Sequence, residues 1–194
     1  MKKIIILMFI AVVVFAGCNK QDKETEKMYE EYVNKAKTSE IKETKCFLGF
    51  HFGWSKQEYY SYMDSLVLSN KVYEDGGSYY YDYHTNVVIY KLQIKPEFYN
   101  DTLYRILYAT EDKSAYLFFV SGFMNSQKDF MPFVIPNIID NEIQDYYYIK
   151  DNMVIEFSQF VGSDFSYMKY TNAPIECKID SIEKAKEKES EKEF

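Results

Sequence analysis

The chain has little of what builds catalytic, phosphate-binding and metal-binding sites. It contains two histidines, and a single arginine, Arg105, among its 23 basic residues. Without an arginine cluster it cannot clamp phosphate groups through bidentate guanidinium contacts. A nucleophile-elbow motif, a phosphate-cradling glycine loop and a zinc-binding helix signature are also missing from the sequence. We therefore expect no enzymatic activity, no cofactor and no metal site.

The remaining candidates for acid–base chemistry are the two histidines and two acidic pairs. His51 and His84 are far apart in the sequence, and a general base needs a partner within hydrogen-bond reach. The acidic pairs, Glu74-Asp75 and Asp140 with Glu142, lie in polar turns. Carboxylates in such turns are usually solvated, whereas a catalytic acid needs a desolvated site that raises its pKa. A hydrolase is therefore the weakest alternative for this chain.

The most specific feature that is present is a secretion signal at the N-terminus. Lys2 and Lys3 precede an apolar run over residues 4–14, and a small-residue approach over residues 15–17 leads to Cys18. The apolar stretch ends at residue 17 and polar residues follow at once. It is therefore shorter than the roughly 20 residues that a membrane-spanning helix needs.

The segment Phe15-Ala16-Gly17-Cys18 resembles the lipobox of bacterial lipoproteins, although Phe15 stands where leucine, valine or isoleucine is usual. The resemblance implies that Cys18 carries fatty acids such as palmitate and becomes the mature N-terminus. Two or three acyl chains on one cysteine give stable membrane anchoring. Asn19 is not the aspartate that retains such proteins at the inner membrane of enteric bacteria, which favours the outer membrane. Residues 20–24 resemble the export signal of some Bacteroidota lipoproteins, so both periplasmic and surface-exposed locations stay open.

Charge and cysteine content narrow the choice of partners further. Cleavage after residue 17 removes Lys2 and Lys3, so the mature chain has 21 basic and 30 acidic residues and a net charge of −9. This charge disfavours binding to nucleic acid and a polybasic contact with anionic lipid. Once Cys18 is acylated, Cys46 and Cys177 remain. They could form a disulfide or stay as two free thiols, because their spacing carries no signature.

Composition divides the chain into four parts. Residues 1–17 are the signal peptide, and residues 18–45 form a charged tether with weak helical periodicity. Residues 46–173 are expected to fold as one domain. Residues 174–194 consist largely of lysine, glutamate, serine and alanine, which predicts a charged C-terminal helix or a disordered tail.

A helix start is the clearest structural signal within the domain. Ser55 and Glu58 fit a capping box, and Trp54 and Tyr59 fit the hydrophobic staple that accompanies one. The spacing predicts a helix over residues 56–70 with one buried face. A short strand over residues 47–52 is expected before it, with Gly49 and Gly53 in tight backbone geometry. Alternating patterns then predict strands over residues 79–84, 88–95 and 102–110.

A weaker second copy of this pattern follows. Ser126 to Asp129 suggests another helix start, although Pro132 and Pro136 make a regular helix unfavourable beyond the first turn. The turn residues Asp151-Asn152 indicate a hairpin. Strands are expected over residues 146–149, 153–159 and 166–171. The apolar run within residues 115–123 fits either a buried strand or a short helix.

These elements predict an α+β fold, with an antiparallel sheet, helices packed on one face, and a weak tandem repeat of helix, strand, strand, strand. The opening over residues 47–58 and the order of elements over residues 47–171 resemble small lipoprotein modules of Bacteroidota, which are reminiscent of the β-lactamase-inhibitor-protein and BamE-like folds. The resemblance implies a non-enzymatic domain that binds a protein partner or supports envelope assembly. It transfers no functional residues.

Three functions remain in order of preference. The first is an envelope lipoprotein whose domain is a protein-interaction or assembly module. The second is a surface lipoprotein that binds glycan or peptide through some of its 20 tyrosines and 15 phenylalanines, which requires rings gathered on one exposed face. The third is the hydrolase, which requires two ionisable groups converging in a pocket.

Overall fold

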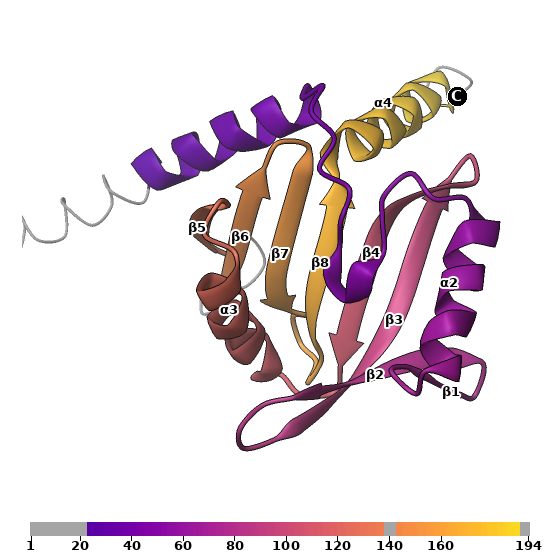
Figure 1. The fold of residues 1–194 in the computed structure, drawn as a ribbon. Coiled ribbons are helices and arrows are strands. Elements are labelled where there is room, and N and C mark those ends of the chain that lie inside the picture. Colours follow the sequence, from indigo (N-terminus) through magenta and orange to yellow (C-terminus); the bar gives the residue numbers. More distant parts are fainter. Residues whose placement is uncertain (1–22, 138–142, 191–194) are drawn as a thin grey trace, which may run out of the picture.

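A single antiparallel sheet organises the molecule. The computed structural model describes residues 23–137 and 143–190, so Cys18, Asp140 and Glu142 lie outside the described residues. Its eight strands follow the spatial order β1-β2-β3-β4-β8-β7-β6-β5 (Figure 1). They are β1 (Tyr73–Asp75), β2 (Ser78–His84), β3 (Ile89–Tyr99), β4 (Thr102–Thr110), β5 (Met131–Pro136), β6 (Gln144–Lys150), β7 (Met153–Gln159) and β8 (Ser166–Asn172).

Two similar halves make up this sheet. In the first half, helix α2 (Lys56–Leu68) precedes β1 to β4, and in the second half helix α3 (Ala115–Ser126) precedes β5 to β8. The last strands of the two halves, β4 and β8, pair with each other at the centre. The α+β fold, the antiparallel sheet and the weak tandem repeat are confirmed. Each copy has four strands, one more than the three that were expected, because a short edge strand, β1 or β5, opens each half.

Helix α2 begins where the sequence places it. The Ser55 side chain accepts a hydrogen bond from the Glu58 backbone, and the Glu58 carboxylate accepts one from the Ser55 backbone, which completes the capping box. The helix ends at Leu68, and Asn70 follows with a positive φ of 54°. Its buried face carries Tyr59, Met63 and Leu66.

The segment before α2 is not the strand that was expected over residues 47–52. Phe47–Gly49 form a 3-10 turn, η1, in which Leu48 and Gly49 have positive φ values of 61° and 86°. The turn crosses the sheet instead of pairing with a strand, and two tyrosine hydroxyls bind its carbonyls. Tyr108 donates to the carbonyl of Phe47 at 2.9 Å, and Tyr62 donates to that of Leu48 at the same distance.

The expected helix start at Ser126 is wrong. Ser126 instead ends α3, and residues 131–136 form the edge strand β5. Helix α3 contains the apolar run whose structure the sequence left open, and it packs against β7 and β8. Pro132 and Pro136 lack the N–H that a central strand would need, so they are tolerated at the sheet edge. The hairpin of β6 and β7 is confirmed, with Asp151 at a φ of 51°.

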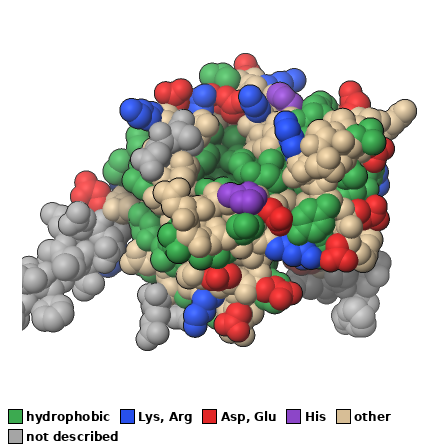
Figure 2. Space-filling view, turned by 60° about the horizontal axis from the view of Figure 1, so that its bottom comes forward, with side chains coloured by type: hydrophobic (Ala, Val, Ile, Leu, Met, Phe, Trp, Pro, Cys, Tyr) green, Lys and Arg blue, Asp and Glu red, His purple; other side chains and the backbone are tan. Residues whose placement is uncertain are grey.

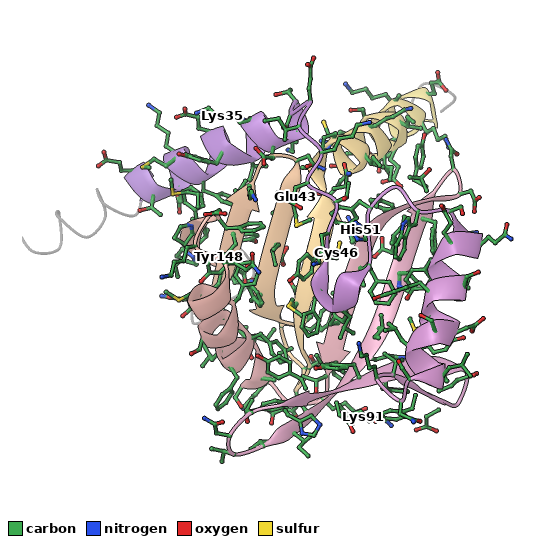
Figure 3. All side chains as sticks on the ribbon, in the orientation of Figure 1. Lys35, Glu43, Cys46, His51, Lys91 and Tyr148 are labelled. Atoms are coloured by element: carbon green, nitrogen blue, oxygen red, sulfur yellow. The ribbon has the colours of Figure 1, made fainter. Side chains whose placement is uncertain are left out.

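The main core lies between the sheet and the helices α2 and α3. Aromatic rings fill much of it, as the packing of side chains in Figure 3 shows. Its largest fully buried side chains include Tyr59, Tyr108, Phe50, Phe119 and Phe157. The abundance of aromatic residues is therefore explained largely by the core.

One buried hydroxyl in this core leads to a testable prediction about stability. Tyr59 is completely buried, and its hydroxyl has no hydrogen-bond partner among the described residues. Leaving a buried polar group unsatisfied costs about 1–3 kcal/mol. We expect Tyr59→Phe to raise the free energy of unfolding, measured by urea denaturation, by about 1 kcal/mol.

Tyr62→Phe is the matched control for this prediction, because the Tyr62 hydroxyl donates to the Leu48 carbonyl at 2.9 Å. This variant should lower the free energy of unfolding by about 1 kcal/mol. A destabilised Tyr59→Phe would show that the hydroxyl has a partner in solution.

A second, smaller core lies on the opposite face of the sheet. Residues 23–37 form a helix, part of the segment predicted as a tether, and this helix packs over β5, β6 and β7. The Tyr29 ring lies 4.6 Å from that of Tyr147 and 5.8 Å from that of Phe133. The charged C-terminal segment forms helix α4 (Ala173–Ser190), which begins directly after β8.

Candidate interaction surface

The sheet face that points away from α2 and α3 stays open over β2, β3, β4 and β8. The helix over residues 23–37 covers only the β5, β6 and β7 part of that face. Strand register aligns the outward residues of neighbouring strands: Tyr80 pairs with Gln93, and Leu107 pairs with both Lys95 and Lys169. We call this surface the open face. It consists of Tyr80, Lys91, Gln93, Lys95, Leu107, Tyr167 and Lys169.

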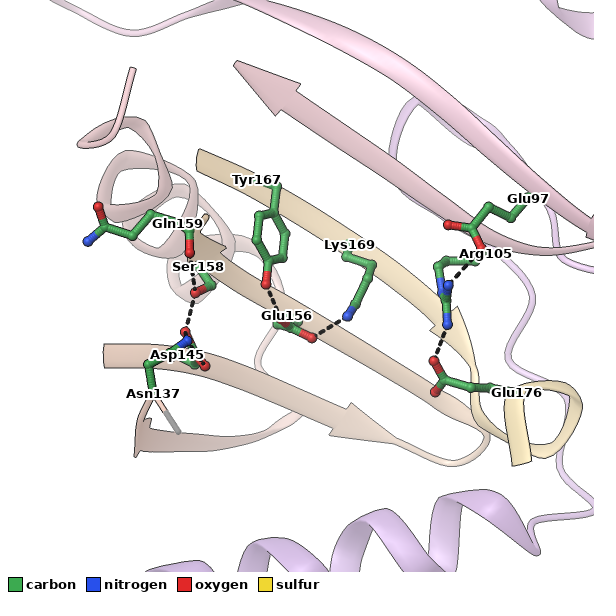
Figure 4. Close-up of polar contacts among 10 residues, drawn as sticks. All are labelled: Glu97, Arg105, Asn137, Asp145, Glu156, Ser158, Gln159, Tyr167, Lys169 and Glu176. Atoms are coloured by element: carbon green, nitrogen blue, oxygen red, sulfur yellow. Dashed lines mark hydrogen bonds and ion pairs between the residues drawn. The ribbon is translucent and has the colours of Figure 1, made fainter. Parts of the chain in front are cut away.

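Arg105 lies at the end of the open face nearest α4. Its guanidinium donates to Glu97 on β3 at 2.6 Å and also binds Glu176 in the first turn of α4 (Figure 4). Tyr104 donates to the same Glu97 carboxylate at 2.9 Å. Burial and then this hydrogen bond raise the pKa of Tyr104 to about 12. One arginine thus joins two sheet strands to the C-terminal helix.

A second polar cluster lies on β6, β7 and β8. The Glu156 carboxylate accepts a hydrogen bond from the Tyr167 hydroxyl and pairs with Lys169 at 2.6 Å (Figure 4). Beside it, Asp145 accepts hydrogen bonds from the hydroxyl of Ser158 and the amide of Asn137. Burial raises the pKa of the Asp145 carboxyl above its ordinary value. Each acidic group therefore has a local partner, and the cluster holds side chains in fixed positions.

Stacked tyrosines lie at the other end of the open face. The Tyr73 and Tyr80 rings are stacked with centroids 5.8 Å apart. The Lys91 ammonium lies 4.0 Å from the Tyr80 centroid and also pairs with Asp75 at 2.8 Å. A cation over an aromatic face is favourable. Because the lysine covers this ring, Tyr80 does not offer a free stacking surface.

A groove of about 300 Å³ adjoins this stack. Tyr80, Lys91 and Gln93 line one side of it, and Ala109 and Phe165 contribute further along. Exposed apolar residues occur in the β2–β3 and β7–β8 connections and at the start of β3. They are Val87, Val88, Ile89, Phe160, Val161 and Phe165. Fixed charges of the open face and exposed apolar side chains such as Ile89 and Phe165 therefore line the same groove.

The two cysteines that could have formed a disulfide are both free. Cys46 is buried in the main core beside η1, whereas Cys177 is half-buried on α4. Burial raises the pKa of the Cys46 thiol far above its ordinary range. This thiol is therefore protonated and unreactive at neutral pH.

The candidate acid–base residues that the structure describes, His51, His84, Glu74 and Asp75, have no ionisable partners that would form a catalytic pair with one another. His51 faces Thr44, with 3.1 Å between its Nδ1 and the threonine hydroxyl, and its ring packs against Trp54. His84 is exposed at the end of β2. Glu74 and Asp75 are exposed on β1. Among the described residues, no cluster of three or more histidine, cysteine or acidic side chains could hold a metal ion.

Trp54 does not provide the exposed aromatic ring that stacking against a glycan or peptide requires. This side chain is half-buried, and its ring packs against Phe50 and Tyr62. The polar residues of the open face were missed as a site, although alternation in β3 already separated Lys91, Gln93 and Lys95 from the apolar residues between them. The ion pair between Arg105 and Glu176 could not be predicted from the sequence, because 71 positions separate the two residues.

Within residues 23–137 and 143–190, no helix combines the length and the apolar character that a membrane span requires. Comparison of the chain with models of protein families, with curated proteins and with solved structures gives no match.

Proposed function

We propose that the chain is a lipid-anchored protein of the cell envelope, held at the outer membrane through Cys18, whose α+β domain binds a protein partner through the open face. The anchor rests on the N-terminal sequence, in which a charged start and an apolar run lead to a lipobox-like cysteine. The binding role rests on one observation. Helices α2 and α3 pack on one face of the sheet, and the opposite face stays accessible over four strands.

The composition of the open face supports a protein partner. Tyrosine and arginine are enriched at protein interfaces, and Tyr80, Tyr167 and Arg105 lie on or beside this surface. Many of its charged side chains are already held by ion pairs, as Arg105, Lys91 and Lys169 are. Side chains that are fixed before binding lose less conformational entropy when a partner docks.

Site-specific crosslinking in intact cells tests the proposal. A photoreactive amino acid in place of Lys95, which is exposed on the open face, is expected to give a discrete crosslinked product. The matched control is the same amino acid in place of Asp64, which is exposed on α2. Leu107→Glu, which puts a charge at the centre of the open face, should remove the product obtained at position 95. Equal products at both positions, or none at position 95, would overturn the proposal.

A further inference from the structure

A cleft on the helical side of the sheet is not used by the proposed function. It lies beside the segment that crosses the sheet between α2 and α3, where Figure 3 places Glu43 and Cys46. Its volume is about 460 Å³, within the range typical of small-molecule sites. Its buried lining residues include Cys46, Phe123, Ile155 and Tyr170.

The cleft continues into a narrower apolar cavity. This second cavity has a volume of about 110 Å³ and shares Phe47, Phe123 and Tyr170 with the cleft. It extends toward Tyr83 of β2 and Phe119 of α3. Figure 2 shows a hollow with hydrophobic side chains on its floor on this side of the molecule. Because the two cavities share these lining residues, they lie next to each other, and this arrangement suits a chain-like ligand better than a compact one.

The charged lining residues of the cleft carry a small positive excess, although the protein as a whole is acidic. Lys45, Lys150 and Glu43 are its charged lining residues. Lys150 donates to Glu43 at 3.1 Å and lies over the Phe130 ring, so these two charges balance each other. Lys45 is exposed and forms no ion pair among the described residues. Lys45 is therefore the charged lining residue that lacks an ion-pair partner among the described residues.

We propose that this cleft binds a single-chain amphipathic anion, a long-chain fatty acid or a ligand of the same chemistry. The hydrocarbon chain would lie along the apolar lining of the cleft and its extension. Lys45 would pair with the carboxylate at the mouth. Burial of each methylene contributes about 0.8 kcal/mol, so most of the affinity comes from the chain, and the lysine selects the charged head.

Photolabelling tests this site with a defined probe. The full chain in phosphatidylcholine vesicles is exposed to palmitate that carries a diazirine in its hydrocarbon chain, and the modified peptides are identified by mass spectrometry. Adducts are expected on residues that line the cleft, such as Cys46, Phe123 or Tyr170. Excess unlabelled palmitate should suppress them, whereas hexadecanol, which lacks the charge, should suppress them much less.

Two charge reversals complete the test. Lys45→Glu should lower labelling of the cleft by about tenfold, the effect expected when an attractive contact becomes repulsive. Lys42→Glu makes the same change at an exposed lysine that does not line the cleft, and it should leave labelling unchanged. A thermal unfolding curve matching the parent chain verifies that Lys45→Glu is folded, and Lys45→Gln replaces it if the curve differs. Adducts that palmitate does not compete away, equal competition by hexadecanol, or equal loss in both reversals would overturn the proposal.

Discussion

Replacing Cys18 with alanine is expected to abolish incorporation of a fatty-acid analogue into the protein and to prevent its processing to the mature form. If the chain is anchored as proposed, the Cys18 thiol is the attachment point of the lipid, and alanine offers no thiol in its place. Because the membrane affinity of a lipoprotein comes from the buried methylenes of its acyl chains, the change removes the lipid anchor. The measurement is metabolic labelling with an alkyne fatty acid, followed by detection on the purified protein.

Cys177→Ala provides the control for this experiment. Cys177 is a half-buried thiol on α4, and its loss should leave labelling intact. Equal labelling of the parent chain and Cys18→Ala, or no labelling of either, would rule out lipidation at Cys18.

Phe157→Ala is expected to lower the free energy of unfolding by about 3–5 kcal/mol, the usual cost of deleting a fully buried phenylalanine. The Phe157 side chain on β7 is 0% exposed. Its ring packs against Phe123 of α3 at 5.5 Å and against Tyr148 of β6 at 5.6 Å. The substitution would therefore open a cavity where α3 joins the sheet. Urea denaturation gives the free energy, and the slope with denaturant shows whether unfolding stays cooperative.

Phe118→Ala is the matched control, since Phe118 lies on α3 itself but is 42% exposed and contacts Tyr90 at the helix surface. Its loss should cost clearly less than that of Phe157, by about 2 kcal/mol or more, because much of the ring is in water and its removal opens no enclosed cavity. A similar cost for both variants would show that α3 is not packed on the sheet as described.

The first half of the fold could be predicted because its signals are local. The capping box of Ser55 and Glu58 is formed within one helical turn, and the alternation in β3 and β4 spans adjacent residues. The structure of η1 could not be predicted, since it depends on hydroxyls from Tyr62 and Tyr108, which are 14 and 61 positions away from their partners. In the second half, the pattern at Ser126 predicted a helix start in the wrong place. The apolar residues before Ser126 form α3 instead, because this helix packs against β7 and β8.

The open face could be predicted in part. Alternation along β3 separates Lys91, Gln93 and Lys95 from the buried residues between them, and so it identifies a polar side of that strand. The alternating pattern does not predict the register between strands. The alignment of Leu107 with Lys95 and Lys169 depends on pairings between strands that are distant in sequence. For the same reason, the junction of Arg105 with Glu176 required the structure.

The prolines of β5 have a consequence for many copies on one membrane. If the chain is anchored as proposed, its copies diffuse in two dimensions with similar orientations, so the sheet edges of neighbours meet far more often than in free solution. An unprotected edge strand would then recruit the next copy through backbone hydrogen bonds. Pro132 and Pro136 remove two N–H donors from the β5 edge, and the other edge, β1, has only three residues. We therefore expect the protein to remain dispersed at high surface density.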